Sequence, residues 1–256
     1  MDGYHHILIT GAAGAIGGAL TDQFARRYPQ ANFTLVDVNE SALKARAALL
    51  GHRARAACWD LFQPDSLADC WARLDADAGP VDLLVNCAGI MDIKSFAGTG
   101  WELGWKLLSV NMISPLRLAD LALQRMPAGG TIINVASMAG RVPISGCSYY
   151  GGAKAGMAQA SEIMHNELES RNINVITVYP GPIYSGLESH ARSQVKTGTV
   201  SKFIPTGQPD GIAERIAVAV AERQPRVIYP MVYNVAHYFN GVSRWVVKHL
   251  SPDPLA

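Results

Sequence analysis

The sequence has little excess charge of either sign. Its 22 lysines and arginines nearly balance 21 aspartates and glutamates, so the formal net charge at pH 7 is +1. Proteins that bind nucleic acid through its phosphates concentrate basic residues on one face or along one segment. Basic and acidic residues are interleaved here, so a nucleic acid is not an expected partner.

Cysteine is scarce and dispersed. The four cysteines share no Cys-x-x-Cys spacing, which gives no basis for a disulfide framework or a zinc site. They are Cys58, Cys70, Cys87 and Cys147. The histidines show no ligand spacing beyond the neighbours His5 and His6, whose side chains would point to opposite faces of a strand. The sequence therefore predicts reduced, mostly buried thiols and no metal site.

Long hydrophobic runs are also missing. The N-terminus has no basic segment, apolar stretch or small-residue cleavage site of a secretory signal, which favours a cytoplasmic protein. Near the other end, residues 231–250 mix apolar side chains with Arg244, Lys248 and His249, too much charge for a membrane-spanning helix. We expect one or two amphipathic helices there. They could pack on the subunit core or interface, cap a lipophilic substrate, or lie on a membrane surface.

Six short apolar runs alternate with longer amphipathic segments. The runs cover residues 5–10, 33–37, 54–59, 81–86, 131–136 and 173–179. Several are apolar at consecutive positions, which is typical of strands covered by helices on both faces. The alternation predicts an α/β protein with a Rossmann-like, doubly wound parallel sheet. We expect one domain over residues 1–230, with residues 231–256 as a helical extension of the same domain in place of a short last strand.

A glycine-rich turn follows the first predicted strand. Residues 10–18 read Thr-Gly-Ala-Ala-Gly-Ala-Ile-Gly-Gly and lead into a predicted helix. Glycine spacing alone is a weak signal, but a strand, a turn with short side chains and a helix N-terminus together favour pyrophosphate binding. The loop therefore predicts a dinucleotide site.

The second predicted strand ends at Asp37. A carboxylate about twenty residues after the glycine turn can accept hydrogen bonds from both hydroxyls of the adenosine ribose. It would repel the 2′-phosphate of NADP, and no Arg or Lys lies in the turn or directly after Asp37 to offset that repulsion. The sequence therefore favours NAD over NADP.

Three side chains form a candidate catalytic group. Tyr150 and Lys154 are four residues apart and would share one face of a helix, and Ser137 follows a predicted strand. A phenol is a poor base near neutral pH, but a nearby ammonium and an oxidised nicotinamide would lower its pKa. Tyr150 could then exchange a proton with an alcohol or carbonyl oxygen held by Ser137. Tyr149 has Ala153, not a lysine, four residues later, which favours packing or substrate contact.

With these residues the chain resembles the short-chain dehydrogenase/reductase family, in its shorter dehydrogenase branch, from about residue 5 to about residue 230. The matching pieces occur in the family's order: Thr10-Gly11…Gly17, Asp37, Asp60, Asn86-Cys87-Ala88-Gly89, Asn111, Ser137, Tyr150, Lys154 and Pro180-Gly181-Pro182-Ile183-Tyr184-Ser185. The catalytic residues implied are Asn111, Ser137, Tyr150 and Lys154. The cofactor contacts expected are Gly11, Gly14, Ala15, Ile16, Gly17, Asp37, Asp60, Leu61, Asn86, Ala88, Gly89, Tyr150, Lys154, Pro180, Gly181, Ile183 and Ser185.

The resemblance also implies roles for individual residues. Asp60 would contact the adenine amino group, and Asn86 and Gly89 would support the cofactor beside the fourth strand. Asn111 would hold a water in a proton relay through Lys154. The backbone of Ile183 would meet the nicotinamide carboxamide, near Ser185, which stands where the family commonly has threonine. Pairing of the family's fourth and fifth long helices implies a homodimer or homotetramer.

One departure concerns the glycine loop. The shorter members usually have glycine at the positions of Gly11, Ala15 and Gly17, whereas this chain has Gly11, Gly14 and Gly17, a spacing closer to the epimerase branch. The chain length and the thirteen residues from Ser137 to Tyr150 favour the dehydrogenase branch. We interpret the shift as a tolerated variant of the loop.

The expected activity is NAD-dependent hydride transfer between nicotinamide and a secondary alcohol or ketone. The alternatives are an epimerase or dehydratase with recycled NAD, and a regulatory protein that binds NAD without chemistry. The substrate pocket would come from residues 90–100, 139–149 and 184–204, whose side chains favour a mainly apolar substrate. The apolar members are Met91, Phe96, Met138, Val142, Ile144 and Tyr184. We expect residues 180–208 to include a mobile lid.

Overall fold

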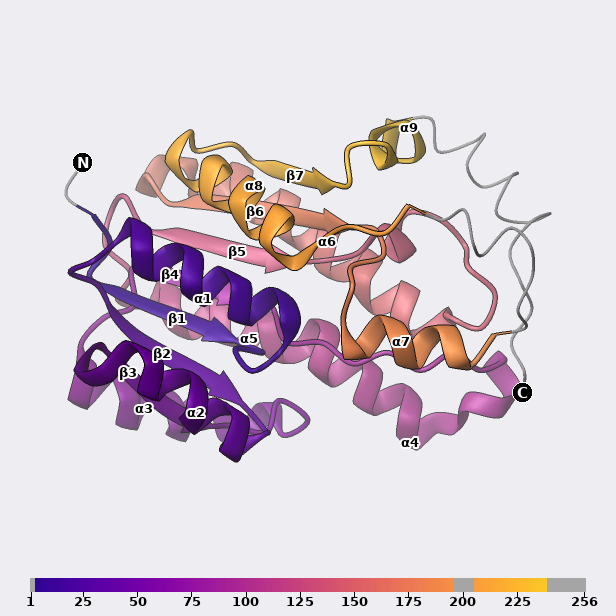
Figure 1. Ribbon diagram of the computed structural model, residues 1–256, viewed down its shortest axis with the longest axis horizontal. Helices are drawn as coiled ribbons and strands as arrows, with labels where there is room; N and C mark the ends of the chain where they lie inside the picture. Colours follow the sequence, from indigo (N-terminus) through magenta and orange to yellow (C-terminus); the bar gives the residue numbers. More distant parts are fainter. Residues whose placement is uncertain (1–2, 196–204, 239–256) are drawn as a thin grey trace.

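The computed structural model describes residues 3–195 and 205–238, which form a sheet covered by helices (Figure 1). The strands are β1 (His6–Thr10), β2 (Asn32–Asp37), β3 (Ala54–Cys58), β4 (Leu83–Asn86), β5 (Thr131–Val135), β6 (Asn174–Pro180) and β7 (Arg226–Tyr229). All pairs are parallel, in the order β3-β2-β1-β4-β5-β6-β7. The predicted doubly wound fold is confirmed.

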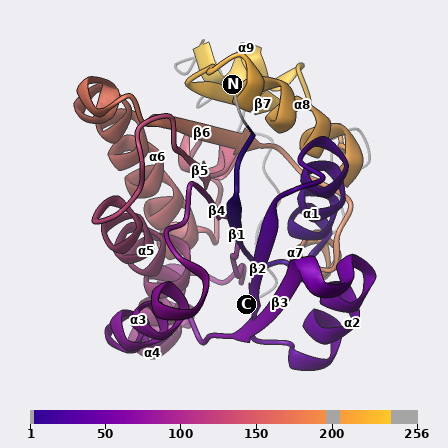
Figure 2. The same cartoon turned by 90° about the vertical axis from the view of Figure 1, so that its left-hand side faces the viewer.

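Helices cover both faces of the sheet (Figure 2). They are α1 (Ala15–Arg27), α2 (Glu40–Leu50), α3 (Leu67–Ala78), α4 (Phe96–Leu108), α5 (Ser114–Leu123), α6 (Ser148–Leu168), α7 (Gly186–Ser193), α8 (Pro209–Ala221) and α9 (Tyr233–Tyr238). On β1, Ile7 and Ile9 join the core under α1, α2 and α8, while Leu8 joins the core under α3 and α5. Consecutive residues of this strand are buried on opposite faces, which accounts for the unbroken apolar run.

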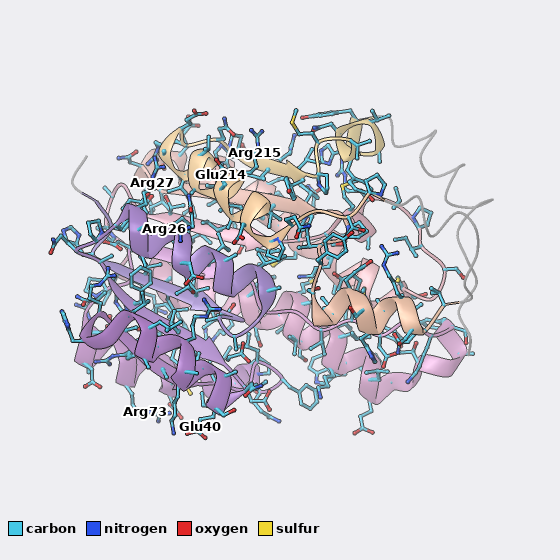
Figure 3. All side chains as sticks on the ribbon, in the orientation of Figure 1. Arg26, Arg27, Glu40, Arg73, Glu214 and Arg215 are labelled. Atoms are coloured by element: carbon cyan, nitrogen blue, oxygen red, sulfur yellow. The ribbon has the colours of Figure 1, made fainter. Side chains whose placement is uncertain are left out.

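The outer surfaces of the helices are charged. Arg26 and Arg27 at the end of α1, and Glu214 and Arg215 on α8, are exposed on the outside of the helix layer (Figure 3). The inner positions of the same two helices, such as Phe24 and Ile216, are fully buried. Each helix is therefore amphipathic, as a cover for one face of a sheet must be.

The six predicted strands are present with ends shifted by at most two residues, but β7 was missed. It has four residues and pairs with β6 at the edge of the sheet, with Arg226 and Tyr229 only partly buried. Such a short run carries little periodic signal. The expectation that residues 231–250 replace a short last strand is therefore wrong, because the strand is present just before them.

The C-terminal helix α9 covers only the first part of the predicted extension, and residues 239–256 lie outside the described residues. Its inner side packs Tyr233 and His237 on the body, with His237 buried against the ring of Tyr179. The boundary at residue 230 stays a prediction. No helix in the described parts of the chain is long and apolar enough to cross a membrane.

All four cysteines are free, as predicted, but the expectation that most are buried is wrong. Only Cys147 is buried, Cys70 and Cys87 are half-buried, and Cys58 is exposed at the end of β3 near the sheet edge. Within residues 3–195 and 205–238, no group of three or more His, Cys, Asp or Glu side chains could hold a metal ion.

Candidate active site

The candidate site lies at the carboxyl ends of the parallel strands. The chain order of the strands reverses between β1 and β4, the place where doubly wound sheets bind ligands. The glycine loop follows β1 and Cys87-Ala88-Gly89 follows β4, so the two segments meet there. A Cβ on Gly11 would lie 2.8 Å from the Cα of Ala88. In Figure 1 the strand arrowheads, α4 and α7 are all at this end of the sheet.

Backbone contacts require two of the loop glycines. Gly11 has a φ of +68°, a left-handed conformation that favours glycine. A Cβ on Gly17 would lie only 2.1 Å from the carbonyl oxygen of Gly11, so no side chain fits. Gly14 begins α1 and donates its N–H to the oxygen of Gly11 at 2.9 Å. The glycines therefore fold the loop back on the start of α1.

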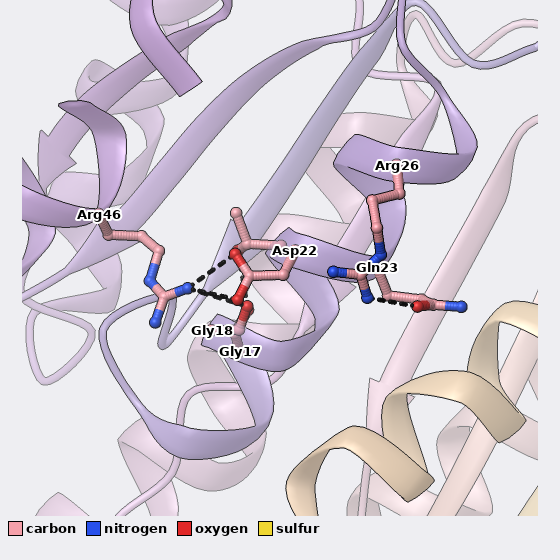
Figure 4. A network of polar contacts seen from close by, with 7 residues as sticks. Gly17, Gly18, Asp22, Gln23, Arg26 and Arg46 are labelled. Carbon is pink, nitrogen blue, oxygen red and sulfur yellow. Dashed lines mark hydrogen bonds and ion pairs between the residues drawn. The ribbon is translucent and has the colours of Figure 1, made fainter. Parts of the chain in front are cut away.

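The N-terminus of α1 is open to an anion. No side chain caps it, and its first turn, with Ala15, Ile16 and Gly17, contains no acidic residue. The free N–H groups and helix dipole there favour a phosphate. One turn further on, Arg46 of α2 donates to Asp22 at 2.9 Å and to the oxygen of Gly18 at 3.3 Å (Figure 4). This ion pair fixes α2 against α1 behind the loop.

Asp37 faces the same loop from the end of β2. Its Oδ2 accepts the N–H of Ala13 at 3.0 Å, and its Oδ1 accepts the N–H of Asn39 at 3.0 Å. The carboxylate is half-buried and its remaining lone pairs can accept hydrogen bonds from a ligand. The structure therefore places Asp37 beside the phosphate loop.

Ser137, Tyr150 and Lys154 come together between β5 and α6. Lys154 is buried and donates its Nζ to the carbonyl oxygen of Val135 at 2.7 Å. The Ser137 Oγ accepts the N–H of Ala139 at 3.1 Å, which leaves its O–H free to donate. Tyr150 is buried on the first turns of α6, and its hydroxyl is near enough to that of Ser137 for the serine to lower its pKa. This arrangement can hold a carbonyl or alcohol oxygen between two hydroxyl groups.

Burial has the largest effect on the pKa values of Tyr150 and Lys154. It raises the pKa of Tyr150 to about 12, against the lowering effect of the Ser137 hydroxyl. It lowers the pKa of Lys154 to about 8. The expected lowering of the tyrosine pKa by the neighbouring ammonium is absent, and Lys154 instead points to the β5 carbonyl. Tyr150 is therefore protonated at neutral pH and suited to supply a proton.

Asn111 lies close to Lys154, in a π-helical turn (Ser109–Ile113) between α4 and α5. Its Nδ2 donates to the carbonyl oxygens of Ile90 and Leu107, both at 2.9 Å. Its Oδ1 is buried without a hydrogen-bond partner. A Cβ on Gly89 would lie 3.0 Å from this oxygen and 3.5 Å from Lys154 Nζ. The absence of a side chain at Gly89 therefore leaves both polar atoms accessible to the same small space.

A comparison with models of known protein families identifies the family to which this chain belongs. The model described as short chain dehydrogenase matches residues 5–196. The chain belongs to the short-chain dehydrogenase/reductase family.

Related proteins agree with this assignment. The nodulation protein G of Rhizobium meliloti is 35% identical over 222 residues, covering 84% of this chain and 86% of that protein. The 3-oxoacyl-[acyl-carrier-protein] reductase FabG of Vibrio cholerae is 31% identical over 216 residues, covering 84% and 87%. A short-chain dehydrogenase from Sphingobium yanoikuyae in complex with NADPH is 27% identical, with a TM-score of 0.80 and 96% of each chain covered.

The residues after β3 and β4 that were predicted to contact the cofactor differ in their exposure and in their hydrogen-bond partners. Asp60 is exposed after β3 and accepts the N–H of Phe62 at 2.9 Å, while Leu61 is buried. Ala88 meets Gly11 through its backbone. The Asn86 side chain instead donates to the carbonyl oxygen of Pro115 and to Asn134 Oδ1, so it supports the sheet.

Ile183, one of the cofactor contacts predicted after β6, forms an isolated parallel β-bridge with Gly207. Gly207 donates to the oxygen of Pro182 at 2.9 Å and accepts from the N–H of Tyr184 at 3.0 Å. Because strand hydrogen bonds alternate in direction, the N–H and C=O of Ile183 point away from Gly207. Those two groups therefore take no part in this bridge, and the carboxamide contact through them stays a prediction. Ser185 caps α7, with its Oγ accepting the N–H of Glu188 at 3.1 Å.

The predicted site residues omitted Thr10, whose side chain helps to build the site. Thr10 Oγ1 accepts the N–H groups of Cys87 and Ala88, at 3.0 and 3.1 Å, and so joins the ends of β1 and β4. Gly181 was predicted as a cofactor contact, and the structure adds a packing reason for glycine there, since a Cβ would lie 2.4 Å from the ring of Tyr233. A threonine directly before the glycine turn was the available signal for Thr10. No sequence signal indicated the contact between Gly181 and Tyr233, which are more than fifty residues apart.

Proposed function

We propose that this short-chain dehydrogenase/reductase uses NAD to move a hydride between nicotinamide and the carbon of a secondary alcohol or ketone. The hydroxyl pair of Ser137 and Tyr150, beside buried Lys154, carries the proposal. Alternatives are a recycled-cofactor epimerase or dehydratase and a non-catalytic NAD-binding protein. The assembled acid–base group argues against the non-catalytic protein, and the chain length and the spacing from Ser137 to Tyr150 argue against the epimerase or dehydratase.

The residues present fit a nicotinamide dinucleotide. An uncapped α1 N-terminus suits the pyrophosphate, Asp37 the adenosine ribose, and the backbone of Ile183 the carboxamide. The bound cofactor supplies or accepts the hydride. Ser137 orients the substrate oxygen by donating a hydrogen bond, and Tyr150 gives its phenolic proton to that oxygen in reduction. In oxidation the phenolate of Tyr150 must receive the proton, and the positive charge of an oxidised nicotinamide would favour that form.

The proton removed from Tyr150 in reduction must be replaced. Lys154 Nζ and the unpartnered Oδ1 of Asn111 lie near the same space beside Gly89. A water there would bond to both and satisfy the buried amide oxygen, which is costly to leave unpaired. Asn111 then holds the water, and Lys154 passes the proton onward.

The first experiment measures absorbance at the NADH wavelength with aliphatic, aromatic and steroidal secondary alcohols. Tyr150→Phe should lower turnover about 10²- to 10⁴-fold, the usual contribution of general acid–base catalysis, with NADH binding unchanged. Tyr149→Phe is the matched control. Tyr149 packs its ring on Phe96 at 5.5 Å, and phenylalanine keeps that contact. Full activity of Tyr150→Phe would refute the mechanism. Bound NAD without net turnover would support a recycled-cofactor or non-catalytic protein.

The NAD preference rests on Asp37. Its carboxylate faces the phosphate loop through Ala13, so a ribose 2′-phosphate would meet a like charge. The related Sphingobium structure contains NADPH, which makes a direct test necessary. Asp37→Ser should lower kcat/KM with NAD about tenfold or more, because hydrogen bonds to a charged group are lost, and should raise the NADP to NAD ratio. An unchanged ratio would refute the assignment.

A mainly apolar substrate is supported by the residues around the tyrosine. Met138 is buried, and Met91 and Ile144 pack against a small apolar cluster of Ile93, Cys147 and Ala191. The panel tests this proposal directly, since a preference for charged sugar acids would contradict it.

We further propose a homodimer or homotetramer that pairs α4 and α6, because α4 exposes Phe96, Trp101 and Trp105 and α6 exposes Ile163. A peripheral membrane contact through residues 231–250 stays a prediction. Met231, Val232, Val235 and Tyr238 are exposed in its first part, and the remainder lies outside the described residues. The cytoplasmic location also stays a prediction.

A further inference from the structure

Tyr184 and Gly207 are the two ends of a segment that contains α7. Its two ends are held together by the hydrogen bonds of Gly207 to Pro182 and Tyr184. Bonds at the ends alone cannot fix the direction of α7, which begins two residues after Tyr184. Arg192 of α7 donates to Oγ1 of Thr206 at 3.0 Å, but Thr206 adjoins Gly207, so a contact between the end of α7 and another part of the molecule must help to fix its direction.

One side chain provides the polar part of that contact. Gln194, directly after α7, accepts the N–H of Ile93 on its Oε1 at 2.9 Å. Its Nε2 donates to Oδ1 of Asp92. The amide thus uses a donor and an acceptor on two consecutive residues about one hundred positions earlier in the chain. The Oδ2 of Asp92 lies 3.5 Å from the Nζ of Lys94, so the same carboxylate also has an ammonium group beside it.

An apolar contact lies beside these bonds. Ala191 of α7 is buried with Ile93 and Cys147, and Val195 packs against the same cluster. Ala191 and Val195 have only small or branched side chains, so they provide area but little direction. The directional bonds of Gln194 therefore orient the end of α7 toward residues 92–93.

The joined segments border the catalytic tyrosine. Asp92 is three residues beyond Gly89, which lies beside Lys154. Cys147 is three residues before Tyr150, and the charge of Glu188 on α7 is close enough to raise the pKa of that tyrosine. The contact between Gln194 and residues 92–93 thus fixes α7 beside the reacting groups.

We propose that Gln194 is a positioning residue: its paired hydrogen bonds to Asp92 and Ile93 hold α7 over the substrate site and thereby set KM for the alcohol or ketone. The kinetic part rests on the function proposed above, while the structural part does not. A substrate enters by separating α7 from residues 92–93, and re-formation of the two bonds encloses it.

The structural test needs no substrate. Hydrogen–deuterium exchange is followed by mass spectrometry in wild type and in Gln194→Leu, which keeps similar volume but removes both bonds. Exchange should rise at least several-fold in peptides covering residues 90–95 and 186–195, and nowhere else. Gln124→Leu, at an exposed glutamine directly after α5, is the control and should change neither peptide. Unchanged exchange in Gln194→Leu, or a rise across the whole chain, would overturn the proposal.

Two further variants separate the hydrogen bonds from general damage. Asp92→Asn keeps an oxygen that can accept from Gln194, so its exchange should stay close to that of wild type, whereas the exchange of Asp92→Leu should resemble that of Gln194→Leu.

The kinetic test uses the panel alcohol that turns over fastest. With this alcohol, Gln194→Leu should raise KM about tenfold, as expected for loss of a hydrogen bond to a charged group. Its kcat should stay within about threefold and its NADH affinity unchanged. An equal loss in kcat and kcat/KM would overturn the positioning role. If no alcohol reacts, the exchange result alone decides, so failure of the proposed activity is distinguishable from failure of this proposal.

Discussion

Lys154 is buried with its ammonium on the carbonyl oxygen of Val135, and burial lowers its pKa to about 8. The charged form therefore predominates below pH 8 and is lost as the pH rises above it. Tyr150, with a pKa raised to about 12, stays protonated throughout that range. An alkaline decrease in reduction must then come from the lysine and not from the tyrosine.

We expect kcat/KM for ketone reduction to fall as the pH rises through about 8, by about tenfold per pH unit above it, because one group loses its proton. Initial rates with NADH between pH 6 and 10 measure this profile. Lys154→Met should be slow at every pH and should lack the alkaline decrease. A wild-type profile that is level up to pH 10 would contradict the role given to Lys154.

The identities of these residues could be predicted from the sequence, but their protonation could not. The four-residue spacing of Tyr150 and Lys154 on one helix is a local property of the chain. Their pKa values depend on burial under segments far away in sequence, and no periodicity reveals that. The same limit applies to Thr10 and Gly181, whose roles come from contacts with β4 and α9.

Among the elements, α6 and three strands share a buried polar network. Asn86 on β4 donates to Asn134 on β5, which donates to Ser161 of α6 at 3.0 Å. Thr177 on β6 donates to the same serine oxygen at 2.8 Å. All four residues are buried, so this network fixes the position of the catalytic helix on the sheet.

Ser161→Ala should lower the free energy of unfolding by about 2 kcal/mol, because two buried donors lose their acceptor. Urea unfolding followed by circular dichroism, at one protein concentration, measures the change. The control is Ser41→Ala on α2, where an exposed hydroxyl donates to Asn39, with an expected change within about 0.5 kcal/mol. Equal effects of the two substitutions would show that the network is not stabilising.

Element types were more predictable than their irregularities. Long apolar strands such as β1 and β6 were found because both faces are buried. The π-helical turn that turns Asn111 toward Ile90 was not, since one extra residue in a helical turn leaves the apolar pattern almost unchanged. β7 was missed because its four residues depend on pairing with β6.

At the scale of the whole molecule, α4 presents aromatic surface to solvent beside an exposed isoleucine of α6. Phe96 and Trp101 are 66% and 68% exposed, and Trp105 is 39% exposed. Trp101 stacks on Trp105 with ring centroids 6.1 Å apart, and Ile163 of α6 is also exposed. Large exposed apolar side chains gathered on neighbouring elements are typical of protein interfaces. Tyr149 packs α6 on α4 at Gly104, so the two helices form one surface.

Replacing both exposed tryptophans with glutamate, in Trp101→Glu/Trp105→Glu, should convert the proposed oligomer to monomers. Charges buried without partners at the centre of an interface cost more than the contact provides. Light scattering after size exclusion, at several concentrations, gives the mass of wild type and variant. Leu49→Glu is the matched control, because Leu49 is 76% exposed on α2, away from this surface, and should leave the mass unchanged. A wild type that is monomeric at all concentrations would refute the proposed oligomer. An oligomer that survives the double substitution would place the interface elsewhere on the molecule.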